Sequence, residues 1–370
     1  MTVWLSLAIW IYLFAFRGGF WRLRERLGKQ RAEVNDKEPL IAIVIPARDE
    51  ALYIAETVTS LRSQRGTFRL DITVADDESS DETASLAARA GANRVIPVRP
   101  RPPQWKGKLW ALREALEAVP SEAEFILFID ADIACDSTDV VQQLLNRGNE
   151  GYDLVTVMVH LRCQSFAEKM LVPAFVYFFF KLYPPSWVAC KPGVAAAAGG
   201  CMLIRRDTLE KLGGIESYRS ALIDDCALAG RVKSVGGRIW LGMSNGELRS
   251  TRGYDSAGVI RSMIARSAFA QLRHSLLFLM GTLAGMGVIY LAPLSFLFTR
   301  DPAIAFLALG AWLLGAIMFA PAVATFRAPV WTIFGLPLIA LFYLAATVES
   351  AWNYWRGRGG VWKGRVQDML

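Results

Sequence analysis

One stretch decides how this chain folds: Phe125-Ile126-Leu127-Phe128-Ile129, followed directly by Asp130-Ala131-Asp132. Five consecutive apolar residues predict a strand that is buried on both faces. The two aspartates then come at the carboxyl end of the strand, where open α/β sheets bind their ligands. Both carboxylates can face one hard cation, and Mg²⁺ or Mn²⁺ bound in this way usually also holds phosphate oxygens. The alternative is an Asp-rich turn in which Asp132 caps a helix, the more common role of an isolated Asp-x-Asp.

The sequence around this stretch alternates strand and helix patterns. Apolar runs predict further strands at 40–46, 70–75 and 93–98, and helix patterns fall at 52–61, from Ser80 onward and at 108–118. Alternation at this spacing predicts a doubly wound, mainly parallel α/β sheet. Asp76 and Asp77 close the second strand at the same sheet edge as Asp130. This recurrence favours a ligand site over a simple turn.

Several common site types are disfavoured by what the chain lacks. No G-x-G-x-x-G follows the first strand and no G-x-x-x-x-G-K-[ST] occurs, which argues against a dinucleotide cofactor or a P-loop mechanism. His160 and His274 are the only histidines, so zinc binding and histidine-base chemistry have few candidates. No block of Lys and Arg with interleaved aromatic residues predicts nucleic-acid binding, although the net charge is +7.

Composition indicates a membrane protein with a soluble head. Of 370 residues, 53% are hydrophobic, and the mean hydropathy is +0.29. The apolar excess lies in four stretches, at 2–16, 276–298, 303–326 and 330–348. The last three are each about long enough to cross ~30 Å of hydrocarbon. The first could be a cleaved signal peptide, but arginines follow it in place of a small-residue cleavage site, so a retained anchor is favoured.

We therefore expect four parts in order along the chain. They are an anchor with a basic flank at 1–26, a head at 36–260, interfacial and transmembrane helices at 261–350, and a basic tail at 351–370. The arginines after the anchor place the head in the cytoplasm, and five scattered cysteines agree with a reducing compartment. Three crossings would then leave the basic tail outside. Either one apolar segment lies in the interface or the charge rule fails, and we favour a cytoplasmic tail.

Within the head, the aromatic segment 166–190 contains Pro173 and is expected to be broken there and to lie flat in the membrane interface. The alternative is a core helix followed by a loop. Small residues at 195–200 let the backbone approach a ligand closely, or simply allow tight packing.

Asp224-Asp225 opens a predicted helix, where a carboxylate pair is often only a cap. A reaction that removes the proton of a hydroxyl group, however, needs a general base, and a carboxylate suits that role. Gln271-Leu272-Arg273-His274 supplies donors that can hold a diphosphate at the membrane face, unless Arg273 only snorkels to the interface.

These motifs, in this order, resemble the family 2 glycosyltransferases with the GT-A fold. The likeness rests on residues 45–50, 76–81, 130–132, 224–225 and 271–274. The chain is still more similar to the hopanoid-biosynthesis (hopene-associated) glycosyltransferases, over nearly its whole length, through residues 105–112, 199–206, 221–228 and 355–365. Relatives that glycosylate ceramide or carotenoid acids are similar in outline. In the family's Q-x-x-R-W motif, glutamine here comes one place late and His274 replaces tryptophan, and Asp224 replaces the commoner glutamate.

The resemblance implies an inverting transfer from a UDP-sugar to a membrane lipid in hopanoid biosynthesis, at the bacterial inner membrane. For the donor, it implies that the nucleoside is held by Ala47, Glu50, Asp77 and Lys108, and that Asp130 and Asp132 reach the ribose and diphosphate through Mg²⁺ or Mn²⁺. It also implies that Asp225 is the catalytic base and that Gly200 and Cys201 line the junction of donor and acceptor. The residues implied to contact the acceptor or the diphosphate are Asp224, Gln271, Arg273 and His274. Alternative acceptors are ceramide-like, carotenoid-like or polyprenyl phosphate lipids. A lipid transporter with a nucleotide-binding head and an inactive binding relative are alternative classes.

Overall fold

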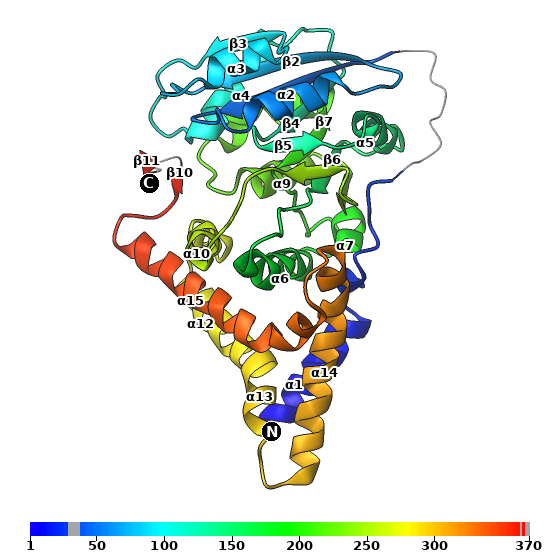
Figure 1. The fold of residues 1–370 in the computed structure, drawn as a ribbon, viewed down its shortest axis with the longest axis vertical. Helices are drawn as coiled ribbons and strands as arrows, with labels where there is room; N and C mark the ends of the chain where they lie inside the picture. The colour runs from blue at the N-terminus through cyan, green and yellow to red at the C-terminus, as the bar shows by residue number, and fades with distance from the viewer. Residues whose placement is uncertain (29–37, 363–364, 367–370) are drawn as a thin grey trace.

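The computed structural model of the chain describes residues 1–28, 38–362 and 365–366. A seven-stranded sheet lies at one end of the molecule and the apolar helices lie at the other, with α6 (Phe166–Leu182) and α10 (Ala257–Ala265) between them (Figure 1). Residues 36–37 of the predicted head (36–260) and residues 363–364 and 367–370 of the predicted tail (351–370) lie outside the described residues.

The large sheet has the strand order β3-β2-β1-β4-β7-β6-β8. Its strands are β1 (Leu40–Ala47), β2 (Arg69–Asp76), β3 (Arg94–Pro97), β4 (Phe125–Ile129), β6 (Leu154–Met158), β7 (Cys201–Arg205) and β8 (Ile239–Met243). All neighbours pair in parallel except β7, which is antiparallel to both β4 and β6. The predicted mainly parallel sheet is confirmed, and every residue of β4 is buried as its apolar run predicts.

Pro46 lies inside β1, although the predicted strand at 40–46 ends at that proline. β1 continues to Ala47, and its pairing with β4 stops earlier, at Val44 opposite Phe128. Beyond Val44 the strand pairs only with β2, so the missing N–H of Pro46 costs no ladder bond on the β4 side. The backbone therefore reaches the sheet edge in extended form.

The helices of the head cover both faces of the sheet (Figure 1). They are α2 (Ile54–Arg62), α3 (Thr83–Arg89), α4 (Gly107–Ala118), α5 (Val140–Asn149), α7 (Pro185–Cys190), α8 (Arg206–Lys211) and α9 (Asp224–Ser234), with the short 3₁₀ turn η2 (Ile215–Tyr218). Outside the head lie α11 (Ala268–Gln271) and the 3₁₀ turn η1 (Phe20–Arg22). α3 begins at Thr83, three residues after the predicted start at Ser80. Asp49 Oδ1 accepts hydrogen bonds from Ser80 N at 2.8 Å and Ser80 Oγ at 3.0 Å, and these bonds hold the segment as a loop.

Two small sheets complete the strands. β10 (Val361–Trp362) pairs with β11 (Arg365–Val366), and β5 (Ile133–Cys135) pairs with β9 (Leu248–Ser250), both antiparallel. β5 directly follows Asp132, so its partner β9 brings the segment after Ser250 to the carboxyl edge of the large sheet. The Thr251 amide donates to the Asp132 carbonyl at 2.8 Å.

α6 continues through Pro173, although the sequence predicts a break there. Its start is secured by a reciprocal cap: Ser165 Oγ accepts from Glu168 N at 3.1 Å, and Glu168 Oε2 accepts from Ser165 N at 2.8 Å. The apolar helix α15 (Leu336–Trp355) packs against α6 close to this proline. Tyr343 Oη of α15 donates to the Leu171 carbonyl at 2.9 Å.

The three apolar stretches at the carboxyl end form helices that are long and apolar enough to cross a membrane: Leu276–Phe296, Pro302–Thr325 and Val330–Trp355. Their parts are α12 (Leu276–Met286), η3 (Gly287–Leu291), α13 (Ala292–Phe296), α14 (Pro302–Thr325), η4 (Val330–Gly335) and α15. α1 (Thr2–Ala15) is shorter, about 21 Å at 1.5 Å per residue, and packs against this group. Trp10 Nε1 donates to the Ile289 carbonyl at 2.9 Å.

α15 lies differently from α14, which runs along the long axis of the molecule (Figure 1). α15 crosses beneath α6 and α10 and contacts the head side at several points. Glu349 pairs with Arg261 of α10 at 3.1 Å, and Ser350 Oγ accepts from Phe269 N at 3.0 Å. α15 thus contacts α6, α10 and α11 through Tyr343, Glu349 and Ser350.

Candidate active site

Lys108 joins the two carboxylate pairs that the sequence singles out. It lies in the first turn of α4, and its Nζ is 2.9 Å from Asp130 Oδ1 and 3.2 Å from Asp224 Oδ2. Burial alone would lower the pKa of Lys108, but the carboxylates of Asp130 and Asp224 outweigh burial and raise it. Lys108, which is predicted to contact the nucleoside, is therefore protonated and lies between Asp130 and Asp224.

Asp132 is paired with an arginine that lies far along the chain. Arg252 Nε is 2.5 Å from Asp132 Oδ2, and its Nη2 is 2.7 and 2.6 Å from the two oxygens of Glu50. The guanidinium also lies over the Tyr53 ring, 4.8 Å from its centroid. Glu50 and Asp132 are both buried, so Arg252 balances two carboxylates that water hardly reaches.

Asp77 lies where β2 ends and is held by the neighbouring strand. Its amide donates to the Ala47 carbonyl at 2.8 Å, and Arg48 Nη1 donates to the Asp77 carbonyl at 2.9 Å. The same nitrogen is 3.4 Å from Asp77 Oδ2. The structure therefore brings Ala47, Glu50 and Asp77 together at the carboxyl edge of β1 and β2, as the predicted nucleoside contacts require.

Asp225 is half-buried at the start of α9, and its two carboxylate oxygens accept hydrogen bonds from different amides. Oδ2 accepts from Gly199 N at 2.9 Å, and Oδ1 accepts from Cys226 N at 2.7 Å. Burial raises the pKa of Asp225 most, Asp224 raises it further, and Lys108 and the two amides oppose them, which leaves it at about 6. A carboxylate with this pKa is largely ionised at neutral pH and still basic enough to accept a proton.

Tyr183, at the end of α6, connects Asp225 with the predicted membrane-face motif. Burial raises the pKa of its hydroxyl, the charges of Cys226 and Asp225 raise it further, and Arg273 opposes them. Gln271 Nε2 donates to the same hydroxyl. Gln271 and Arg273 thus lie near Asp225 through Tyr183. His274 instead stacks on Tyr354 of α15, with ring centroids 4.1 Å apart.

Gly200 and Cys201 lie at the start of β7, beside Asp130. The Gly200 carbonyl accepts from Asp130 N at 3.2 Å. The Cys201 side chain is fully buried in the sheet opposite Ile129, and this burial raises the pKa of its thiol. Gly199, rather than Gly200, is the small residue in contact with the predicted base.

Asp130 and Asp132 are suited to bind a divalent cation whose remaining coordination positions are filled by phosphate and water oxygens. Each carboxylate has one oxygen paired with a cationic side chain, and the Asp132 charge helps to raise the pKa of Asp130, after burial as the larger cause. One oxygen from each aspartate, with phosphate oxygens and water, would suit Mg²⁺ or Mn²⁺. Within the described residues, no group of three His, Cys, Asp or Glu side chains could hold a metal alone.

A cavity of about 870 Å³ opens beside the loop that leads into Asp224 and Asp225. It is lined by that loop, by α10 and α11 and by the end of α15, namely by residues including Ala221, Ile223, Arg266, Phe269, His274 and Tyr354. The cavity therefore adjoins the loop that precedes the predicted base and reaches the end of α15.

Three further residues contribute to this site, and sequence reasoning misses two of them, Arg252 and Tyr183. Arg252 lies in the loop after β9, and no pattern in the chain connects it with Glu50 or Asp132. Tyr183 ends an aromatic helix in which it is one ring among many. Only Gly199 has a signal, since it belongs to the run of small residues that predicts a close backbone approach.

The sheet order and the edge occupied by these carboxylates define the class of the head, a GT-A fold. The mannosyltransferase PcManGT from Pyrobaculum calidifontis, solved with GDP-Man and Mn²⁺, shares this fold with a TM-score of 0.54 and 19% sequence identity. The likeness covers 94% of this chain and 99% of that chain, the apolar helices included.

Residues 42–213 match the family Glycosyl transferase family 2. The 4,4'-diaponeurosporenoate glycosyltransferase of Staphylococcus aureus is 32% identical over 114 residues, which are 31% of this chain and 29% of that protein. The match thus spans less than a third of the length of that relative. The family 2 resemblance of the head is supported, and the closer hopanoid likeness stays an expectation.

Proposed function

We propose that this chain is a membrane-bound, inverting glycosyltransferase that moves a sugar from a nucleotide-sugar to a hydroxyl group of a lipid. The observation that carries the proposal is the position of Asp225. It is half-buried, held by two amides, and linked through Asp224 and Lys108 to Asp130, the expected donor ligand. One carboxylate therefore lies where it can remove the acceptor proton while the donor is held beside it.

The donor end is suited to a diphosphate leaving group. Arg48 and Asp77 lie at the proposed nucleoside end, and Asp130 and Asp132 at the diphosphate end. A divalent cation bound there would offset the charge that develops on the departing diphosphate. The solved relative contains GDP-Man and Mn²⁺, which supports the nucleotide-sugar class. The choice of UDP rests on the family resemblance.

The acceptor end faces the apolar helices. The cavity beside residues 221–223 reaches α15, so a lipid with a hydroxyl-bearing head could approach Asp225 from the membrane. The name of the curated relative gives a carotenoid-type acid as its substrate, which supports a lipid acceptor. A hopanoid is the acceptor we propose, because the motifs along nearly the whole chain resemble the hopanoid-biosynthesis family.

The test uses the full-length chain in its membrane. Membranes that contain it are incubated with UDP- and GDP-sugars and a lipid panel that includes a hopanoid, and mass spectrometry detects the glycosylated lipid. We expect one lipid product from the wild type and a loss of about 10²- to 10⁴-fold in Asp225→Asn, which keeps donor binding. Asp255→Asn is a matched control at an exposed carboxylate. Full turnover in Asp225→Asn would refute its role as the base.

A further inference from the structure

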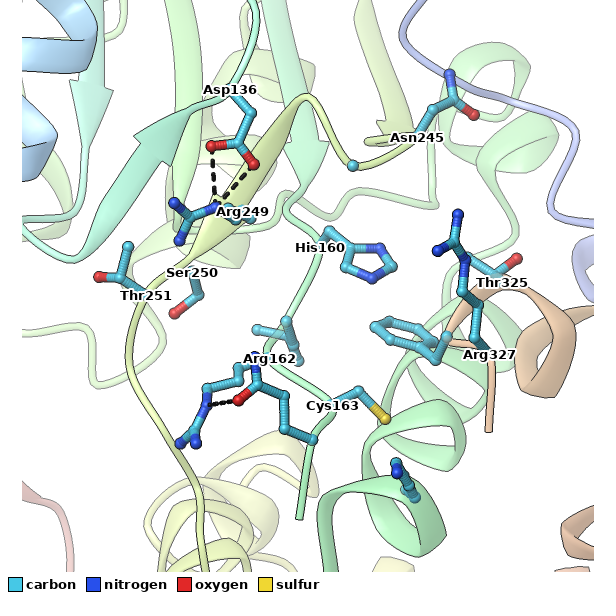
Figure 2. A pocket seen from close by; sticks show the side chains of 15 residues that line it. Asp136, His160, Arg162, Cys163, Asn245, Arg249, Ser250, Thr251, Thr325 and Arg327 are labelled. Atoms are coloured by element: carbon cyan, nitrogen blue, oxygen red, sulfur yellow. Dashed lines mark hydrogen bonds and ion pairs between the residues drawn. The ribbon is translucent and has the colours of Figure 1, made fainter. Parts of the chain in front are cut away.

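A second cavity, of about 760 Å³, is lined by none of the residues placed in the candidate active site. Its walls come from the loop after β6, the start of α6, the loop before β9 and the carboxyl end of α14. Figure 2 shows His160, Arg162 and Arg249 around it, with Thr325 and Arg327 on the side of α14. Arg252, three residues after Arg249, instead reaches Asp132 in the candidate active site.

The described lining residues carry four basic side chains, Arg162, Lys169, Arg249 and Arg327, against one acidic side chain, Asp136. Two of the four are paired: Arg249 Nε is 2.7 Å from Asp136 Oδ2, and Arg162 Nη1 is 2.6 Å from Asp255 Oδ1. The other two, Lys169 and Arg327, have no hydrogen-bond or ion-pair partner for their side chains in the part of the chain that the structure describes. The cavity therefore has an excess of positive charge.

His160, which lines the cavity, has a pKa that nearby positive charges help to lower. Its ring stacks on Phe326 with centroids 4.6 Å apart, and its Nδ1 is buried without a hydrogen-bond partner. Burial lowers the pKa of His160 most, and the charges of Arg26 and Arg327 lower it further. An anion in the cavity would relieve the repulsion among these groups and give the imidazole a partner.

Arg327 is held in a backbone conformation that costs free energy. It follows α14 with φ of 50°, and its amide donates to the Ala324 carbonyl at 3.1 Å. Glycine is the residue that usually occupies this left-handed position after a helix, because a Cβ is disfavoured there. A strained residue that carries a charge into a basic cavity is the kind of outlier that marks a binding site.

The cavity lies at the carboxyl end of the apolar helix α14, where Thr325, Phe326 and Arg327 line it. α14 is long and apolar enough to cross a membrane, and Phe326 after its carboxyl end stacks on His160 of the head. Arg26 Nη2, in the basic flank after α1, donates to Thr325 Oγ1 at 2.7 Å. Close to Lys169 and Arg327 along the chain, Phe166 and Trp331 are 73% and 54% exposed and their rings are 6.3 Å apart. Exposed aromatic rings beside basic side chains are typical of the membrane interface.

We propose that this cavity binds the phosphate of an anionic phospholipid, with Lys169 and Arg327 as its ligands and the acyl chains lying against Phe166 and Trp331. A soluble phosphate shares the same chemistry, but it would make no use of the exposed rings. The assignment does not depend on the transfer reaction, because none of these residues belongs to the candidate active site.

The test titrates phosphatidylglycerol or phosphatidylcholine into the purified full-length chain in neutral detergent and counts bound lipids by native mass spectrometry. The variant Lys169→Gln/Arg327→Gln removes both unpaired charges. Lys211→Gln/Arg300→Gln is the matched control, since both of its side chains are exposed and lie elsewhere. Each basic side chain near an anionic lipid contributes about 1 kcal/mol to the binding free energy, which is about fivefold in affinity. The test variant should therefore bind phosphatidylglycerol about 20- to 30-fold more weakly than the wild type, and the control should match the wild type.

The charge-conserving variant Lys169→Arg/Arg327→Lys should restore most of the preference for phosphatidylglycerol, which distinguishes lost binding from misfolding. Equal binding of phosphatidylglycerol by the wild type and the double glutamine variant would overturn the proposal. Inorganic phosphate provides the other arm. If phosphate alone raises the melting temperature through Lys169 and Arg327 and phosphatidylglycerol is not preferred over phosphatidylcholine, the site takes a soluble anion and the lipid assignment is wrong.

Discussion

The Gly199 amide donates a 2.9 Å hydrogen bond to Asp225 Oδ2, across 26 residues of sequence. This contact and the bond from Cys226 N leave the Asp225 carboxylate little freedom to rotate. A proposed base has to keep a fixed position relative to the acceptor hydroxyl, because catalysis depends steeply on that geometry. Gly199 thus belongs to the proposed active site through its backbone amide alone.

Gly199→Ala should therefore lower turnover about tenfold or more without unfolding the head. A Cβ on residue 199 would lie 3.1 Å from Asp225 Oδ2 and 3.4 Å from its Cβ, so the carboxylate would have to move. Steady-state kinetics with the identified donor and acceptor measure the effect. The control is Gly230→Ala on α9, where a Cβ meets nothing within 4 Å. It should keep turnover and gain about 0.5–1 kcal/mol in stability. Wild-type turnover in Gly199→Ala would show that the contact does not position the base.

The rate should depend on pH through Asp225. Because burial and Asp224 raise the pKa of Asp225 to about 6, the carboxyl is protonated below that pH and cannot accept the acceptor proton. kcat/KM should then rise with pH up to about 6 and level off above it. The measurement is a pH profile at saturating divalent cation. The residual activity of Asp225→Asn should lack this limb, and an unchanged limb in that variant would assign the titration to another group.

Arg252→Met should destabilise the head strongly. The substitution leaves Glu50 and Asp132 buried without their cation, a loss of about 3–5 kcal/mol in the free energy of unfolding. Thermal unfolding in one detergent measures the change, and adding Glu50→Gln should recover part of it. Arg249→Met is the matched control three residues away. It also loses two ion pairs, but with acids that are about half exposed, Asp136 and Glu56, so its cost should stay below about 1 kcal/mol. Equal losses in both variants would contradict the buried balance we describe.

The basic tail should lie on the same side of the membrane as the head. We expect α12 with α13 and α14 to cross, and α15 to lie along the interface, because Glu349 and Ser350 contact Arg261 and Phe269 on the head side. Single cysteines in a cysteine-free chain test this with an impermeant maleimide. Arg358→Cys should label together with Glu122→Cys of the head, and Arg300→Cys, in the loop before α14, should label from the opposite side. Labelling of 358 together with 300 would make α15 a third crossing.

Much of the fold follows from local patterns. β4 has the bounds its apolar run predicts, and α4 and α9 begin within one residue of their predicted starts. The three apolar stretches are helices. β6 and β8, at the far side of the sheet, are not singled out by the sequence, and the antiparallel direction of β7 is invisible in it. An apolar run reports burial, but its strand direction depends on which neighbours it meets.

The sequence by itself determined that carboxylates would gather at one sheet edge, because Asp77 and Asp130 directly follow strands whose carboxyl ends must meet in a parallel sheet. Only the tertiary structure decided their partners. Lys108 lies between Asp130 and Asp224, and Arg252 reaches Asp132 across 120 residues, through the pairing of β9 with β5. Periodicity and motif spacing report on neighbours along the chain, whereas the charge balance of a buried site depends on groups that topology brings together from distant segments.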